Sequence, residues 1–197
     1  MLKIGITSGI GAGKTTVSKI FELLAVPVYY ADERAKQLMN EDESLKNSIL
    51  HHFGKEVYAS GTLNRKILSG IVFNDANKLA LLNSLVHPAT IADAEKWMLQ
   101  QKTHYTIKES AILFESGANK QLDAVIGVSA PFELRLSRVM KRDNIPAKKV
   151  LERMNKQMKK KKKMKRCDYI IFNDEQQLLI PQVLELHNVL LKKAASQ

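Results

Sequence analysis

The sequence has little cysteine and no long apolar run, and both shortages narrow the class of protein. Its single cysteine, Cys167, excludes a disulfide within the chain, so we expect a reducing compartment. No apolar run approaches the ~18 residues of a membrane-spanning helix, so we expect no membrane partner. The residues after Met1 lack the pattern of a secretory signal peptide. Together these absences predict a cytoplasmic location.

Acidic residues are scarce relative to basic ones. With 31 Lys and Arg against 20 Asp and Glu, the formal net charge is +11, which favours anionic partners such as nucleotides, phosphorylated metabolites, nucleic acid or a membrane surface. Seven of the eight residues from Lys159 to Arg166 are basic. Much of the excess therefore lies in one segment of a chain whose length suits a single α/β domain with insertions.

Glycine is sparse as well, with nine residues, yet three stand at alternate positions from Gly9 to Gly13. They follow an apolar, β-branched run at residues 4–7 and precede Lys14, Thr15 and an amphipathic helical pattern. In this order, the backbone N–H groups can surround an anion, and the helix adds its positive N-terminal end. Lys14 can then bridge terminal phosphates while Thr15 ligates Mg²⁺. The pattern predicts a nucleotide-binding phosphate loop.

The loop departs from the strict pattern G-x-x-x-x-G-K-[ST], because Ser8 occupies the position of the first glycine. A serine there either destabilises a turn that needs a positive φ, by about 1 kcal/mol, or adds a hydrogen bond to phosphate. The simpler alternative is a glycine-rich turn with an incidental lysine. That alternative leaves unexplained why Gly-Lys-Thr-Thr opens an amphipathic helix.

Five short apolar runs alternate with helical stretches along the chain, which predicts a parallel sheet covered by helices on both faces. The predicted strands are residues 4–7, 26–31, 110–114, 125–129 and 169–172. Ligands of such sheets bind at the carboxyl ends of the strands. Residues 8–16, Asp32, Glu115 and Pro131 all fall at those ends.

The interval between the second and third predicted strands is too long for one crossover, so residues 33 to about 106 are expected to form a mainly helical insertion. Within it, residues 74–85 have helical periodicity, and His87-Pro88 should end that helix and start another. Further helices are predicted at residues 131–142 and 178–191.

Asp32 ends the second predicted strand and should face the phosphate loop across the sheet edge. A carboxylate there can accept a proton from a substrate hydroxyl, as a general base in phosphoryl transfer. Aspartate is also a favoured N-cap, and a helix is expected to start near Glu33. The residues alone leave the two interpretations open.

Six elements in order make the chain resemble the dephospho-coenzyme A kinase family over nearly its whole length. These elements are the loop at residues 7–16, Ala31-Asp32, Leu63-Asn64-Arg65, His87-Pro88, the segment 111–115, and the later set Leu136-Ser137-Arg138, Arg142-Asp143, Gln157 and 168–173. The sequence departs from the family pattern at Ser8, Ala12 and Thr15, and at Tyr30, which stands where the family has a first acid.

The resemblance implies a three-layer αβα P-loop NTPase fold with a five-stranded parallel sheet. Residues 1–32, 107–134 and 167–197 would form the nucleotide-binding core, 33–106 a helical acceptor-binding insertion, and 135–166 a lid region. It also implies phosphorylation of the ribose 3′-hydroxyl of 3′-dephospho-coenzyme A by MgATP, the last step of coenzyme A synthesis.

The same resemblance implies roles for individual residues. Asp32 would be the base, Lys14 would neutralise charge on the transferring group, Arg138 would reach the phosphates from the lid, and Thr15 would hold Mg²⁺. The ATP-binding residues would be Gly11, Ala12, Gly13, Lys14, Thr15, Thr16 and Arg142. The acceptor-binding residues would be Asp32, Arg65, His87, Leu113 and Glu115.

Each of these side chains also has a plainer interpretation. His87 could be a packed or capping residue, Arg65 an exposed helix residue, and Glu115 the cap of the turn ending at Gly117. Arg135, three residues before Arg138, is interpreted as part of a solvated helix face.

The lysine run from Lys159 to Lys163 should lie where the lid returns to the sheet. Its charges repel one another, so we expect a mobile segment that is either solvated or in contact with phosphate through one or two lysines. Non-specific nucleic-acid binding through residues 159–166, weakened by salt, is a further expectation. The sequence assigns no oligomeric state.

Two rival functions remain. Another small P-loop kinase, for a nucleoside monophosphate or shikimate, would share the loop, the sheet and the lid. A nucleic-acid-binding module with a degenerate loop would account for the lysine run and Ser8, although aromatic residues for stacking are sparse around the run.

Overall fold

The computed structural model describes residues 1–73 and 75–196. Asn74, at the start of the predicted insertion helix, and Gln197, at the end of the predicted core, lie outside the described residues. The chain forms two compact units, one of Met1–Tyr30 with Met98–Gln197 and the other of Ala31–Trp97.

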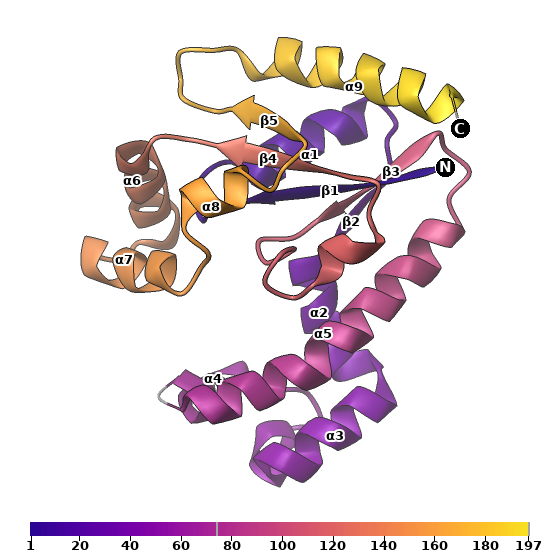
Figure 1. The fold of residues 1–197 in the computed structure, drawn as a ribbon. Helices are drawn as coiled ribbons and strands as arrows, with labels where there is room; N and C mark the ends of the chain where they lie inside the picture. The colour runs from indigo at the N-terminus through magenta and orange to yellow at the C-terminus, as the bar shows by residue number, and fades with distance from the viewer. Residues whose placement is uncertain (74, 197) are drawn as a thin grey trace. The chain divides into compact units, whose positions relative to one another are not determined.

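The first unit is built on a five-stranded, all-parallel sheet, which confirms the predicted α/β fold class (Figure 1). The strand order is β2-β3-β1-β4-β5, so the N-terminal strand lies at the centre. The strands are β1 (Leu2–Ser8), β2 (Val28–Tyr30), β3 (Tyr105–Glu109), β4 (Ala124–Ser129) and β5 (Tyr169–Phe172).

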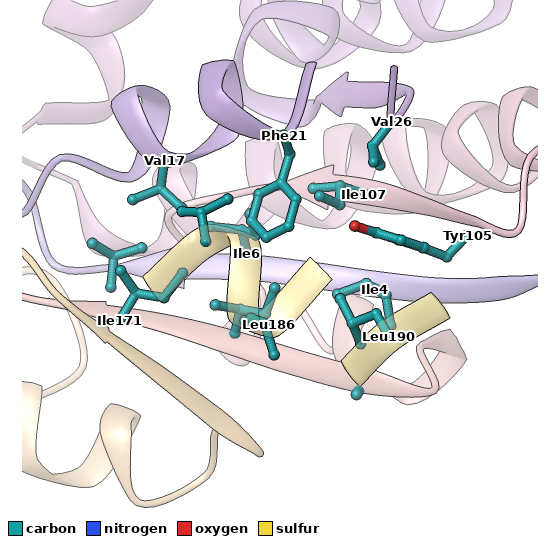
Figure 2. Packing of buried hydrophobic residues seen from close by; sticks show 14 of the residues in the cluster. Ile4, Ile6, Val17, Phe21, Val26, Tyr105, Ile107, Ile171, Leu186 and Leu190 are labelled. Atoms are coloured by element: carbon teal, nitrogen blue, oxygen red, sulfur yellow. The ribbon is translucent and has the colours of Figure 1, made fainter. Parts of the chain in front are cut away.

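Helices α1 (Lys14–Leu23) and α9 (Leu179–Ala195) cover one face of this sheet. Alternate residues of each strand point toward these helices, because successive side chains of a strand lie on opposite faces. Figure 2 shows Ile4 and Ile6 of β1 beside Phe21 of α1 and Leu186 of α9. This is the main apolar core of the unit.

The opposite face of the sheet is covered by the segment after β3 and by α8 (Lys160–Met164). Two glycines permit this close packing. A Cβ at Gly5 would lie 2.8 Å from the side chain of Leu113, and one at Gly127 would lie 2.9 Å from the sulfur of Met164. Helices α6 (Phe132–Asp143) and α7 (Ala147–Asn155) connect β4 to this region, and η2 (Ala118–Gln121) precedes β4.

The third strand was predicted five residues too late in the chain. Residues 111–115 form turns, and β3 pairs instead through Tyr105–Glu109, with Ile107 opposite Ile4 of β1 and Val28 of β2. Within β3, Tyr105 and Ile107 join the apolar core, whereas Thr106 and Lys108 occupy the other face. Because polar residues alternate with apolar ones in β3, it was not predicted as a buried strand. The apolar segment that follows it was predicted as the strand instead.

The second unit is helical, as predicted for this part of the chain. It comprises α2 (Ala31–Glu41), α3 (Glu43–Phe53), η1 (Lys55–Tyr58), α4 (Arg65–Phe73) and most of α5 (Ala76–Leu99). Its core draws on all of these elements and includes Leu38, Leu45, Ile49, Phe53, Val57, Leu68, Val72 and Val86.

The predicted break at His87-Pro88 is wrong, since α5 runs through Pro88 without interruption. Proline removes one backbone donor from the helix. The helix tolerates that loss because buried Val86 and half-buried neighbours pack into the core of the unit on both sides of the proline. The Thr90 hydroxyl also donates to the carbonyl oxygen of Val86, at 2.8 Å.

Candidate functional site

The loop between β1 and α1 has the backbone expected of a phosphate loop. Gly11 and Gly13 have φ values of 80° and 89°, a region in which a side chain would be strained. Ala12 donates its N–H to the carbonyl oxygen of Gly9 at 3.2 Å, and α1 begins directly after Gly13. Thr15 and Thr16 are exposed in the first turn of that helix. The loop therefore presents a helix N-terminus and two hydroxyl groups to solvent.

Ser8 belongs to β1 and has no positive φ, so of the two alternatives for this position the strained turn is wrong. It is buried, and its hydroxyl donates to the carbonyl oxygen of Gly9 at 3.0 Å. A serine fits at the position of the first glycine of the strict motif, because this residue has strand geometry.

Arg135 of α6 braces the same loop. It is only 7% exposed, and its Nε donates to the carbonyl oxygen of Ile10 at 3.0 Å. The guanidinium lies so close to Gly9 that a Cβ there would be 2.6 Å from Nη2. Burial lowers the pKa of Arg135. The interpretation of Arg135 as part of a solvated helix face is therefore wrong.

Lys14, the first residue of α1, forms an ion pair with Glu109, the last residue of β3. Both side chains are largely buried, and the second carboxylate oxygen of Glu109, Oε2, has no hydrogen-bond partner among the described residues. Glu109 was not predicted as a site residue, because the third strand was predicted too late in the chain. An acid at the true end of that strand would have been the signal.

The segment that follows β5 contacts the loop at Ala12. Asn173 donates from its side-chain amide to the carbonyl oxygen of Ala12 at 3.0 Å. Arg138 of α6 in turn donates to the backbone oxygen of Asn173 at 3.2 Å and pairs with Glu175 at 2.8 Å. Arg142, one turn further along α6, is mostly exposed and pairs with Asp143 at 2.7 Å.

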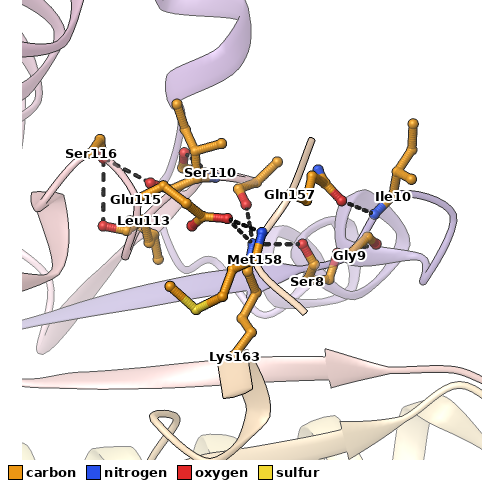
Figure 3. A network of polar contacts seen from close by, with 12 residues as sticks. Ser8, Gly9, Ile10, Ser110, Leu113, Glu115, Ser116, Gln157, Met158 and Lys163 are labelled. Carbon is orange, nitrogen blue, oxygen red and sulfur yellow. Dashed lines mark hydrogen bonds and ion pairs between the residues drawn. The ribbon is translucent and has the colours of Figure 1, made fainter. Parts of the chain in front are cut away.

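Glu115 contacts Lys163, the last residue of the lysine run, next to Ser8 at the start of the loop (Figure 3). One oxygen of Glu115 accepts from Lys163 Nζ at 2.9 Å and from the backbone N–H of Met158 at 3.1 Å. Burial alone would raise the pKa of Glu115, but these hydrogen bonds outweigh burial and lower it. The carboxylate also accepts a hydrogen bond from its own backbone N–H. Lys163, with no exposed surface, is not part of a solvated face. Leu113, two residues before Glu115, is fully buried.

Asp32, Arg65 and His87 lie in the second unit. Asp32 is in the first turn of α2, which begins at Ala31, so it is not an N-cap of a helix starting near Glu33. Arg65 is the exposed first residue of α4, and its charge helps Lys36 to lower the pKa of Glu33. The first turns of α2 and α4 are therefore neighbours. His87 is half-buried in α5, and burial lowers its pKa.

Two kinds of feature are absent from the described part of the chain. No helix there is long and apolar enough to cross a membrane. Over the same residues, no group of three or more His, Cys, Asp or Glu side chains could hold a metal ion by itself.

A parallel sheet with a phosphate loop after its central strand, a buried lysine at the start of α1 and an acid at the end of β3 defines the class of P-loop kinases. Shikimate kinase from Acinetobacter baumannii shares this fold, with a TM-score of 0.59 over 98% of this chain and 94% of that chain, at 15% identity.

The family model for dephospho-CoA kinase matches residues 2–178, and the chain belongs to that family. The dephospho-CoA kinase of Bacteroides fragilis (strain YCH46) is 36% identical over 193 residues, which cover 98% of this chain and 94% of that protein. The dephospho-CoA kinase of Porphyromonas gingivalis is 36% identical over 187 residues, which cover 94% of this chain and 93% of that protein.

Two solved structures are similar to this chain over nearly its whole length. The dephospho-CoA kinase from Campylobacter jejuni has a TM-score of 0.71 at 27% identity, covering 97% of this chain and 98% of that chain. TT1252 from Thermus thermophilus has a TM-score of 0.80 at 28% identity, covering 98% of this chain and 97% of that chain. The chain is thus a phosphotransferase of a family that catalyses the last step of coenzyme A biosynthesis.

Proposed function

We propose that this chain transfers the γ-phosphoryl group of ATP to the ribose 3′-hydroxyl of 3′-dephospho-coenzyme A, with the phosphates held by the loop at residues 9–16. The observation that carries the proposal is the position of Lys14, which starts α1 directly after a loop with two left-handed glycines. The N–H groups of Gly11, Ala12, Gly13, Lys14, Thr15 and Thr16 would hold the phosphate oxygens. Lys14 would neutralise the charge on the transferring group.

The donor set near Lys14 fits a magnesium ion bound together with ATP. Thr15 is exposed one residue after Lys14, and Glu109 has a buried oxygen without a hydrogen-bond partner among the described residues. Magnesium in kinases takes one or two protein oxygens together with phosphate oxygens, so a larger protein cluster is not needed. When bound, the ion would offset the negative charge of the phosphates. Thr15 is the proposed ligand, and Glu109 pairs with the neighbouring Lys14.

Asp32 is the proposed general base. It follows the last residue of β2 by two positions and lies in the first turn of α2. The 3′-hydroxyl proton would pass to the Asp32 carboxylate as the oxygen bonds to the γ-phosphorus. The bond from the γ-phosphorus to the β,γ-bridging oxygen breaks, and ADP leaves.

Arg138 and Arg142 are the proposed lid cations. Arg138 already spans from α6 to Asn173, which bonds to the loop at Ala12, so its guanidinium lies on the same side of the loop as Asn173. A rigid guanidinium fork stabilises charge spread over phosphoryl oxygens. Arg142 is the next cation on the same helix.

The acceptor side would be built from Arg65, His87, Leu113 and Glu115, together with Asp32. Arg65 is exposed and close enough to α2 to act on Glu33, which adjoins the proposed base. His87, whose pKa is lowered by burial, would be neutral and able to donate one hydrogen bond. We place the reaction in the cytoplasm.

The test is acceptor-dependent ADP release with MgATP. Purified protein is assayed separately with 3′-dephospho-coenzyme A, nucleoside monophosphates, shikimate and single-stranded RNA. The products are identified by mass. A product with one added phosphate should form only from 3′-dephospho-coenzyme A, and Lys14→Met should abolish it. Phosphorylation of another acceptor, or turnover that RNA stimulates, would contradict the proposal.

A further inference from the structure

Lys163 is the one member of the lysine run that is buried, and it lies under the start of the phosphate loop. Its side chain has no exposed surface, whereas Lys161 and Lys162 are exposed on the same helix. The ammonium group has three N–H donors. It makes three contacts: the carbonyl oxygen of Ala111 at 2.6 Å, Glu115 Oε1 at 2.9 Å and the carbonyl oxygen of Ser8 at 3.5 Å.

These three acceptors belong to elements far apart in the sequence. Ser8 ends β1, while Ala111 and Glu115 belong to the turns after β3. Lys163 itself lies in α8, which follows the lid region. One side chain therefore joins the last residue before the loop to the segment after β3 (Figure 3).

The residues just before α8 make a second set of contacts with the same two elements. Gln157 accepts through its side-chain oxygen from the N–H of Ile10, at 2.9 Å, and the N–H of Met158 donates to the Glu115 oxygen that Lys163 also contacts. The loop backbone is thus held at Ser8 and Ile10 by the segment 157–163.

The charges make Lys163 more than a packing residue. A buried ion pair is neutral as a pair, but removing one partner leaves the other charge uncompensated. Without Lys163, the Glu115 carboxylate would stand alone beneath a loop that binds polyphosphate, and like charges repel. Without Glu115, the ammonium group would keep its two carbonyl contacts.

We infer that Lys163 is a positioning residue for phosphate binding, which fixes the Ser8 end of the loop and neutralises Glu115 below it. This role rests on the proposed phosphate site at residues 9–16. It predicts that nucleotide affinity responds to the Lys163–Glu115 pair as a unit, and that Glu115 acts on the nucleotide side whether or not it also contacts the acceptor.

The test measures ADP binding by calorimetry, without turnover, for Lys163→Met, Glu115→Gln and the double variant. Lys165→Met is the matched control, since it removes an exposed positive charge two residues away. Unfolding midpoints in urea establish that each protein is folded. We expect Lys163→Met to raise the Kd for ADP about tenfold, as for a lost hydrogen bond to a charged group. The control should stay within about twofold.

The double variant separates positioning from simple loss of stability. It should bind ADP more tightly than Lys163→Met, because the lone carboxylate is gone, even if it is no more stable in urea. The inference is overturned if folded Lys163→Met binds ADP as tightly as the unaltered protein. It is also overturned if the fold-loss of ADP affinity in the double variant equals the product of the fold-losses in the two single variants.

Should Lys163→Met not fold, Glu115→Gln takes its place, with an expected loss of about threefold in ADP affinity. Unchanged affinity in that variant overturns the inference. If the unaltered protein itself does not bind ADP, the proposed function fails instead, so the two failures are distinguishable.

Discussion

Arg135 donates to the carbonyl oxygen of Ile10 across 125 positions of the sequence, and its guanidinium fills the space where a Cβ of Gly9 would stand. Gly9 is therefore required by close approach and not by a positive φ, unlike Gly11 and Gly13. Arg135 therefore holds the Gly9 and Ile10 part of the loop against α6.

Gly9→Ala should destabilise the protein by about 1–3 kcal/mol, because the new methyl group must displace a buried guanidinium. The free energy of unfolding in urea is the measurement. Gly70→Ala in α4 is the matched control, since nothing lies within 4 Å of a Cβ there. Alanine is favoured over glycine in a helix interior, so the control should stabilise by about 0.5–1 kcal/mol. Equal effects of the two substitutions would contradict the role of Arg135.

Asp32→Asn should lower kcat by about a hundredfold or more, the usual contribution of a general base, while the Kd for ADP stays unchanged. Asparagine keeps the shape and hydrogen-bonding capacity of the side chain but cannot accept the hydroxyl proton. Steady-state kinetics and ADP calorimetry on the same preparation give both numbers. Glu41→Gln, an exposed acid at the other end of α2, is the control. Equal turnover in Asp32→Asn would remove the assigned role.

Arg138→Ala should lower kcat by about a hundredfold, since the guanidinium would no longer stabilise charge on the phosphoryl oxygens. The competing explanation is that Arg138 only ties α6 to Asn173 and Glu175. In that case the variant would lose stability and keep its kcat. Arg153→Ala, an exposed arginine of α7 that pairs with Asp143, controls for loss of a lid charge and should leave kcat unchanged.

Stability should decrease as the pH falls below about 6.5, the ordinary pKa of histidine. The Tyr105 hydroxyl and His187 Nδ1 share a hydrogen bond of 2.7 Å, and burial lowers the pKa of His187. In that pH range the unfolded chain binds a proton that the folded one does not, so acid favours unfolding. His187→Gln should flatten this part of the profile of unfolding free energy against pH. A profile with unchanged slope would contradict the assignment, although His87 also contributes to the slope.

The sequence predicted the fold well where hydrophobicity and structure coincide. Residues 4–7 and 125–129 fall within β1 and β4, and 169–172 coincide with β5. The prediction failed at β3, where Thr106 and Lys108 face the more polar side of the sheet, and at Pro88, where tertiary packing outweighs the loss of one backbone donor. Both failures arise because the local sequence pattern does not show which residues pack against each face of a strand or helix.

The loop itself could be predicted because its chemistry is local, with glycines, Lys14 and Thr15 adjacent in sequence. The residues that support it could not, because their roles depend on distant contacts. Lys163 has four identical predecessors, from Lys159 to Lys162, and only the turn of α8 decides which of them is buried. Arg135 and Arg138 look equivalent in sequence, yet one holds Ile10 and the other holds Asn173.

The central position of β1 has a consequence for synthesis on the ribosome. This strand emerges first, but its neighbours begin at Tyr105 and Ala124, and Leu2 pairs with Tyr105. The nascent chain must therefore carry an unpaired apolar strand while the whole segment 31–97 is translated, and the ladder can close only afterwards. The helical segment has its own apolar core and can form during this interval. The chain thus delays assembly of its nucleotide site until most of the protein has been made.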